Sequence, residues 1–148
     1  MLRLSILLSL SILVAMATAC NSGRHSSAGF RLPDGGDVEK GKAAFVALQC
    51  HTCHKVEGVE LPQPTAQPPV PVTLGGQVTE VMTDGYLVTS IINPSYELAL
   101  YPKEQITVNG KSRMPDYADK ITARQLTDVV AFLQSHYSVR RIPNKYTY

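Results

Sequence analysis

The chain has 148 residues, and its 14 Lys and Arg against 12 Asp and Glu give a formal net charge of +2. A surface that binds nucleic acid needs a basic stripe, which this balance does not supply, so we expect no nucleic-acid partner. The length suits one domain with a modest core. Only three cysteines are present, and the two motifs that contain them leave none for a disulfide framework.

The N-terminal segment has the layout of a secretory signal. Residues 1–19, MLRLSILLSLSILVAMATA, carry one early positive charge at Arg3, an apolar run and a small-residue end. The run is short for a membrane span, which takes about 20 apolar residues, and no later stretch is long and apolar enough. We therefore predict a signal peptide over residues 1–19 and an exported protein.

Cys20 directly follows this segment, and two interpretations are open. Ala17-Thr18-Ala19 fits an ordinary signal-peptidase site, beside which the cysteine would be incidental. The stretch ATAC also resembles the lipobox of bacterial lipoproteins, in which the cysteine is acylated and becomes the mature N-terminus. We favour lipidation of Cys20, because an unpaired thiol is unusual in an exported protein. Residues 20–36 are rich in Ser and Gly and are then expected to form a flexible tether to the periplasmic face of a bacterial membrane.

The folded domain is predicted to begin at Asp37, a suitable N-cap for the sequence VEKGKAAFVALQC. Four residues at helical spacing mark one face of this helix: Val38, Gly41, Phe45 and Leu48. A glycine within a helix costs about 1 kcal/mol relative to alanine. Gly41 therefore indicates that another helix crosses closely at that point.

Two further helices are predicted. One runs from about Tyr86 to Ile92, with its cap near Thr83 or Asp84, and must stop by Asn93 because a proline follows. The last helix begins with a capping box at Thr122-Ala123-Arg124-Gln125. Its apolar stripe comprises Leu126, Val129, Val130, Leu133 and Tyr137.

Proline-containing segments separate these helices. Residues 59–72 hold five of the ten prolines, which excludes a regular helix or a central strand there, and residues 93–121 are also predicted to be loop. The sequence thus predicts an all-α, loop-rich domain over residues 37–148. Its core is small, and such a domain often needs another component to complete it.

The segment CHTCH, residues 50–54, carries the clearest chemical signal. Two thiols one helical turn apart can add to the two vinyl groups of one porphyrin, and the next residue is then held under the iron. Zinc would need two more ligands, and the usual second pair is absent. A thioredoxin-like pair needs a helix start in a βαβ setting, which is not evident. We predict that Cys50 and Cys53 attach a haem and that His54 binds its iron, whereas His51 is a bystander.

Two methionines outside the predicted signal could supply the opposite iron ligand. Met114 lies in KSRMPDY, in a loop just before the capped helix, and Pro115 stiffens the chain beside its sulfur. Met82 immediately precedes the helix predicted near Tyr86. Core packing is the ordinary role of a lone methionine. We favour Met114 as the second ligand and keep Met82 as the competitor.

Four stretches together resemble class I monohaem cytochromes c: EKGKAAF, CHTCH, RMPDY and LTDVVAFL. The resemblance covers about residues 37–137. It implies the cytochrome c fold, in which the first and last helices of a small helical domain cross and wrap around one covalently bound haem c. In that family a glycine and an aromatic residue form the crossing, which here places Gly41 and Phe45 against Val129 and Phe132.

Within the family, YLVTSIINPS followed by the Met-Pro segment is similar to the cytochrome c domain fused to some oxidase copper subunits, the subunit II fusions. No copper site is expected, because only Cys20 remains beyond the haem pair. Members usually carry a Gly-Pro whose proline carbonyl accepts the N–H of the proximal histidine. This chain offers Pro68, Pro69 and Pro71 without the glycine, and the choice among them stays open. Residues 97–113 make a longer approach to the methionine than compact members have.

These predictions lead to a function. With His54 and Met114 both on the iron, no position is open to oxygen or substrate, so we expect a one-electron carrier of a bacterial respiratory chain, with no catalytic residue. Its partners would be redox proteins at the membrane surface. One alternative is a haem subunit docked permanently in an oxidase or dehydrogenase complex through residues 59–72 and 97–113. Another is a haem enzyme or gas sensor, which requires Met114 to be off the iron.

Overall fold

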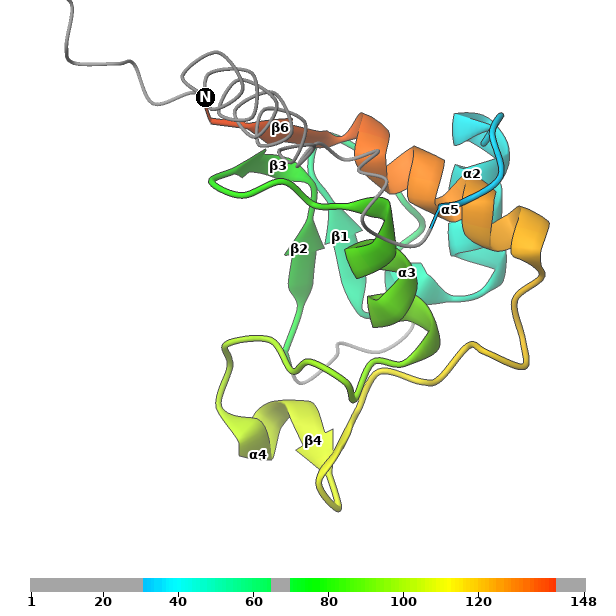
Figure 1. The fold of residues 1–148 in the computed structure, drawn as a ribbon. Helices are drawn as coiled ribbons and strands as arrows, with labels where there is room; N and C mark the ends of the chain where they lie inside the picture. The colour runs from blue at the N-terminus through cyan, green and yellow to red at the C-terminus, as the bar shows by residue number, and fades with distance from the viewer. Residues whose placement is uncertain (1–30, 65–69, 141–148) are drawn as a thin grey trace, which may run out of the picture.

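The structure is a computed structural model that describes residues 31–64 and 70–140 (Figure 1). The predicted signal peptide, Cys20 and the tether as far as residue 30 lie outside the described residues, and so do Pro68 and Pro69. Within the described ranges no helix is both long enough and apolar enough to cross a bilayer.

Two crossed helices pack on each other at one side of the molecule, α2 at Val38–Ala47 and α5 at Ala123–Ser135 (Figure 1). Phe45 and Phe132 meet edge to face, with their ring centroids 5.6 Å apart. A Cβ atom on Gly41 would overlap the backbone carbonyl of Asp128 and lie 2.7 Å from Cβ of Phe132. Val129 is buried in the same core. The close crossing predicted at Gly41 is therefore confirmed.

The start of α2 is tied to α5 by the residues before it. The Asp37 side chain accepts a hydrogen bond from the Lys40 backbone N–H at 3.0 Å, which confirms the predicted N-cap. The Asp37 backbone N–H donates to Asp128 Oδ1 at 2.9 Å. A Cβ atom on Gly36 would lie 2.7 Å from Cβ of Ala131, so the chain already packs on α5 before the helix begins. Val38, predicted on the buried face of α2, is exposed instead.

The third predicted helix is present as α3, Asp84–Ile92, and begins two residues before Tyr86. Its cap is Thr83, whose hydroxyl accepts from the Tyr86 backbone N–H at 3.1 Å. Leu87 and Val88 point into the core. The buried Gln134 of α5 donates through Nε2 to the Met82 carbonyl at 2.6 Å, which fixes the chain just before α3 on the last helix.

Short parallel strand pairs accompany the helices. β1 (His54–Val56) pairs with β2 (Val72–Leu74), and β3 (Gly76–Val78) pairs with β6 (Tyr137–Val139). Tyr137 begins β6, so the prediction that it continues the apolar stripe of the last helix is wrong. Each strand is only three residues long, which is too short for a periodic pattern to reveal it.

The predicted loop 93–121 contains more regular structure than expected. A single helical turn, α4 (Lys103–Ile106), leads into a hairpin of β4 (Thr107–Val108) and β5 (Lys111–Ser112). Figure 1 shows α4 and β4 at the side of the molecule opposite α2 and α5. Asn109 and Gly110 connect the strands with φ of 51° and 77°. Asn-Gly is a strong hairpin signal because both residues tolerate positive φ. The prediction of a loop throughout residues 93–121 did not take this signal into account.

Buried side chains of α2, α3 and α5 make one core, joined by Val56 of β1. α5 contributes half of its buried residues: Leu126, Val129, Val130, Phe132 and Leu133. The described part of the chain thus has four α-helices and little strand. The small, mostly helical fold with crossed first and last helices is the one predicted.

Candidate haem site

A sharp turn presents the two cysteines of CHTCH. α2 ends at Ala47, earlier than predicted, because Gln49 adopts a left-handed conformation with φ of 60°. The chain then forms the single turn η1 (Cys50–Thr52), in which the Cys53 backbone N–H donates to the Cys50 carbonyl at 3.2 Å. Thr52 Oγ1 donates to the Gln49 carbonyl at 2.7 Å and reinforces the turn. Both thiols therefore project from one helical turn, the spacing that attachment to one porphyrin requires.

The two thiols differ in environment. Cys50 is half-buried and Cys53 is exposed, and neither forms a disulfide. Burial raises the pKa of the Cys50 thiol to about 11. A thioredoxin-like nucleophile needs a lowered pKa, because the thiolate is the reactive form. The raised pKa at Cys50 argues against that interpretation.

His54 follows Cys53 as the first residue of β1. Its Nδ1 atom is buried and has no hydrogen-bond partner among the described residues. Burial lowers the pKa of the imidazole, and the Val72 backbone acts in the opposite direction. A neutral imidazole is the form that binds a metal. Nδ1 of His51 is likewise buried and without a partner in the described part of the chain, although His51 was predicted to be a bystander.

The segment beside His54 is strand β2. The register pairs His54 with Val72, and the Val72 backbone N–H donates to the Cys53 carbonyl at 3.1 Å. Of the three prolines considered as neighbours of the histidine, only Pro71 is described, and it is exposed. The sequence predicted a proline beside His54, whereas the residue paired with it in the structure is Val72. The pairing could not be predicted, because no local sequence signal sets the register of two short strands.

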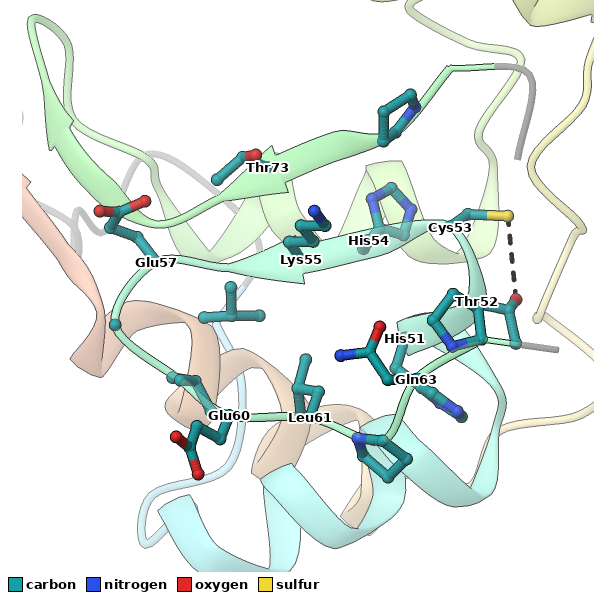
Figure 2. A pocket seen from close by; sticks show the side chains of 16 residues that line it. His51, Thr52, Cys53, His54, Lys55, Glu57, Glu60, Leu61, Gln63 and Thr73 are labelled. Carbon is teal, nitrogen blue, oxygen red and sulfur yellow. Dashed lines mark hydrogen bonds between the residues drawn. The ribbon is translucent and has the colours of Figure 1, made fainter. Parts of the chain in front are cut away.

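A cavity of about 570 Å³ adjoins the CHTCH turn (Figure 2). It is bounded by the run His51–Pro64, together with Pro71 and Thr73. Figure 2 shows Leu61 and Gln63 pointing from the loop towards β1, with His51 and Thr52 at one end. The volume falls within the range of about 300–1,000 Å³ that is typical of small-molecule and cofactor sites. His54 and Cys53 line this cavity, whereas Met114 and Cys50 do not.

The two candidate methionines lie on different parts of the scaffold. Met114 is half-buried just after β5, and its backbone N–H donates to Ser112 Oγ at 3.1 Å. Met82 is held through its carbonyl by Gln134 of α5. Tyr117, near Met114, donates its hydroxyl to the Leu48 carbonyl at 2.9 Å. This contact brings the Met114 segment to the end of α2, directly before the CHTCH turn.

Sequence reasoning did not identify Tyr117, which is 9% exposed and adjoins Cys50. Its only local signal is its place in RMPDY, and a tyrosine there does not reveal its partner 69 residues away. Among the described residues no group of three or more His, Cys, Asp or Glu side chains comes together as a metal site would require. CHTCH therefore gains no further zinc ligands from the described residues.

This small domain has crossed helices, two free thiols on one turn and a half-buried imidazole directly after it, which is how a carrier of covalently attached haem is built. The family model for cytochrome c matches residues 38–136. The chain belongs to the cytochrome c family. No curated protein and no solved structure gives a significant match.

Family membership establishes the cofactor and the general role, which are covalent haem c and haem-based electron transfer. The residues present fit the cofactor. Cys50 and Cys53 are free to form thioethers, and His54, whose buried Nδ1 lacks a partner among the described residues, adjoins a cavity of suitable volume. Haem also supplies the large apolar body that a domain of this size lacks.

Proposed function

We propose that this cytochrome c is a membrane-tethered one-electron carrier of a bacterial respiratory chain, with His54 and Met114 as the ligands of a single haem iron. The observation that carries the proposal is the hydrogen bond from the Tyr117 hydroxyl to the Leu48 carbonyl, 2.9 Å long. It joins the segment of Met114 to the helix end that leads into Cys50. Met82 is instead tied by its carbonyl to α5.

The haem iron supplies one-electron redox chemistry. Cys50 and Cys53 would hold the group covalently, so that it is not lost between encounters with redox partners. His54 and Met114 would both bind the iron, which would leave no site for oxygen or substrate. A neutral thioether ligand favours the reduced iron and raises the reduction potential relative to two imidazoles. This ligand set suits electron transfer and leaves no role for a catalytic residue.

Confinement to the membrane rests on the N-terminal sequence. We propose that residues 1–19 are cleaved as a signal peptide and that Cys20 is acylated, which anchors the protein at the periplasmic face. Two or more acyl chains give stable anchoring, at about 0.8 kcal/mol for each buried methylene. The predicted tether, residues 20–36, would then lead from the anchor to the helical domain, and its last residue packs on α5. Tethering raises the effective concentration of the haem domain near redox proteins of the same membrane.

A specific observation favours a second candidate, a haem subunit docked permanently in an oxidase or dehydrogenase complex. Several large apolar side chains of one stretch are exposed: Tyr96, Leu100, Tyr101 and Val108. Leu100 is fully exposed. Clustered exposed apolar side chains are typical of protein interfaces. Purification of the protein as a lone monomer after detergent extraction would count against this candidate.

The ligand assignment is tested by the near-infrared band that sulfur-to-iron charge transfer gives in the ferric protein. We expect the band in the wild type and in Met82→Ala, and its loss in Met114→Ala. Loss in Met82→Ala alone would assign the ligand to Met82. A wild type that lacks the band and readily binds carbon monoxide would instead be the open-site haem enzyme or gas sensor.

The anchor is tested by the mass of the mature protein. We expect a mass that includes one haem and the acyl chains on Cys20, and extraction into the detergent phase. The variant Cys20→Ser should keep the haem and lose the acyl mass and the detergent partitioning. A wild-type mature protein with a free Cys20 would exclude the lipid anchor without affecting the haem assignment.

A further inference from the structure

Tyr117 lies in the loop before α5, yet its side chain is buried and hydrogen-bonds to the end of α2. It is 9% exposed, and its hydroxyl donates to the Leu48 carbonyl at 2.9 Å. Leu48 is the C-cap of α2, where carbonyl groups lack partners within the helix. The hydroxyl therefore satisfies an acceptor that α2 leaves open, and it does so from a segment 69 residues further along the chain.

The backbone of Tyr117 is fixed as well. Its carbonyl accepts hydrogen bonds from the backbone N–H groups of Lys120 and Ile121, at 2.9 and 3.0 Å. These bonds connect it to the start of α5. Tyr117 is thus held at its carbonyl by the approach to α5 and at its hydroxyl by the end of α2.

Met114 lies in the short stretch between this fixed point and the β4–β5 hairpin. On the hairpin side its backbone N–H donates to Ser112 Oγ at 3.1 Å. Ser112 is in turn held by Ser95, whose Oγ accepts from the Ser112 backbone N–H at 3.1 Å. Pro115 restricts the backbone directly after Met114. The Met114 segment is therefore held on one side by Ser112 and on the other by Tyr117. Of the two, only the Tyr117 hydroxyl bonds to the end of α2, the helix that precedes Cys50.

The hydroxyl can serve as a donor throughout the ordinary pH range. Burial is the main cause that raises the pKa of Tyr117 to about 12, and Cys50 and Cys53 contribute in the same direction. Conversion of these cysteines to thioethers removes their charge, whereas the burial of the ring stays. The phenol is therefore protonated and available to the Leu48 carbonyl.

We propose that Tyr117 is a positioning residue for Met114, whose hydroxyl bond to Leu48 limits how often the methionine leaves the iron. This inference rests on the proposed ligation by Met114 and deepens it. A buried hydrogen bond lost on one side leaves its acceptor unsatisfied, and such a loss changes an equilibrium about fivefold to tenfold. The variant Tyr117→Phe should open the methionine–iron bond more often by this factor, because it keeps the ring and removes only the hydroxyl.

The test measures how fast imidazole displaces the methionine from the ferric holoprotein, at imidazole concentrations high enough for bond opening to limit the rate. We expect Tyr117→Phe to keep the near-infrared band and to raise the limiting rate about fivefold to tenfold. Complete loss of the near-infrared band in Tyr117→Phe, with the band kept in Tyr96→Phe, would also support the inference, because it would mean that the methionine no longer stays on the iron. Tyr96→Phe, the same chemical change at an exposed tyrosine, should leave the rate within twofold of the wild type.

A remote destabilising variant separates positioning from general stability. Asp128→Ala removes a hydrogen bond at the α2–α5 crossing, away from Met114, and should not raise the limiting rate. If Asp128→Ala raises the rate as much as Tyr117→Phe at an equal loss of stability, the inference is overturned. An unchanged rate in Tyr117→Phe overturns it as well, while the near-infrared band of the wild type still upholds Met114 ligation. Absence of that band from the wild type overturns both.

Discussion

Gly41 of α2 and Asp128 of α5 are in direct backbone contact, since a side chain at position 41 would occupy the space of the Asp128 carbonyl. The same aspartate accepts a hydrogen bond from the Asp37 backbone N–H at 2.9 Å. One residue of the last helix therefore fixes both the start and the middle of the first. Because α2 leads directly into the CHTCH turn, this crossing sets where Cys50 and Cys53 lie relative to the core.

Gly41→Ala should destabilise the protein. Helix propensity alone would make this change favourable by about 1 kcal/mol. Overlap with the Asp128 carbonyl opposes it, and forced overpacking costs typically about 1–3 kcal/mol. We therefore expect a net loss of stability in denaturant unfolding of the holoprotein. The control Ala43→Gly, on the exposed side of the same helix, should lose about 1 kcal/mol from propensity alone. A Gly41→Ala variant as stable as the wild type would contradict the close crossing.

Asp128→Ala should cost about 1–3 kcal/mol of unfolding free energy, because it removes the acceptor of the Asp37 backbone N–H at a position that is 5% exposed. Asp128→Asn keeps an oxygen at the same place and should cost less. Denaturant midpoints of the two holoprotein variants measure the difference. Equal losses for the alanine and asparagine variants would show that this hydrogen bond does not matter.

Substitution of the cysteines should separate covalent attachment from folding. Cys50→Ala and Cys53→Ala should each keep haem through the remaining thioether, and the double variant should release it on denaturation. The mass of the denatured protein gives the result directly. Cys20→Ser is the matched control, which changes a cysteine outside the turn and should retain the haem mass. A double variant that still holds haem after denaturation would exclude attachment at CHTCH.

Stability should fall in alkaline solution through Tyr117. The pKa of this tyrosine is raised by burial to about 12, whereas tyrosine in an unfolded chain ionises near pH 10. The folded state therefore prefers the neutral phenol, and its contribution is complete below about pH 10 and is lost as the pH rises towards 12. Denaturant midpoints between pH 9 and 12 should fall more steeply in the wild type than in Tyr117→Phe. Identical slopes would mean that Tyr117 ionises equally well in the folded and unfolded states.

Features set by neighbouring residues were predictable from the sequence. Asp37, Thr83 and Thr122 each cap a helix by accepting from the backbone N–H three residues further on, so a short stretch of sequence contains the whole signal. The cysteine spacing in CHTCH likewise describes one turn. The Asn109-Gly110 hairpin was also readable and was missed. The left-handed conformation of Gln49, which ends α2 early, could not be predicted from the sequence, because glutamine rarely adopts positive φ.

Long-range pairings depended on the folded chain. Parallel strands place Val72 beside His54, and the burial of Tyr117 brings its hydroxyl to Leu48. Three-residue strands and a single tyrosine hydroxyl carry no periodic pattern, so their partners follow from how α2, α3 and α5 pack. The helix caps and the CHTCH turn were thus predictable because they depend on local hydrogen bonds, whereas packing of distant apolar faces brought the Met114 segment to that turn.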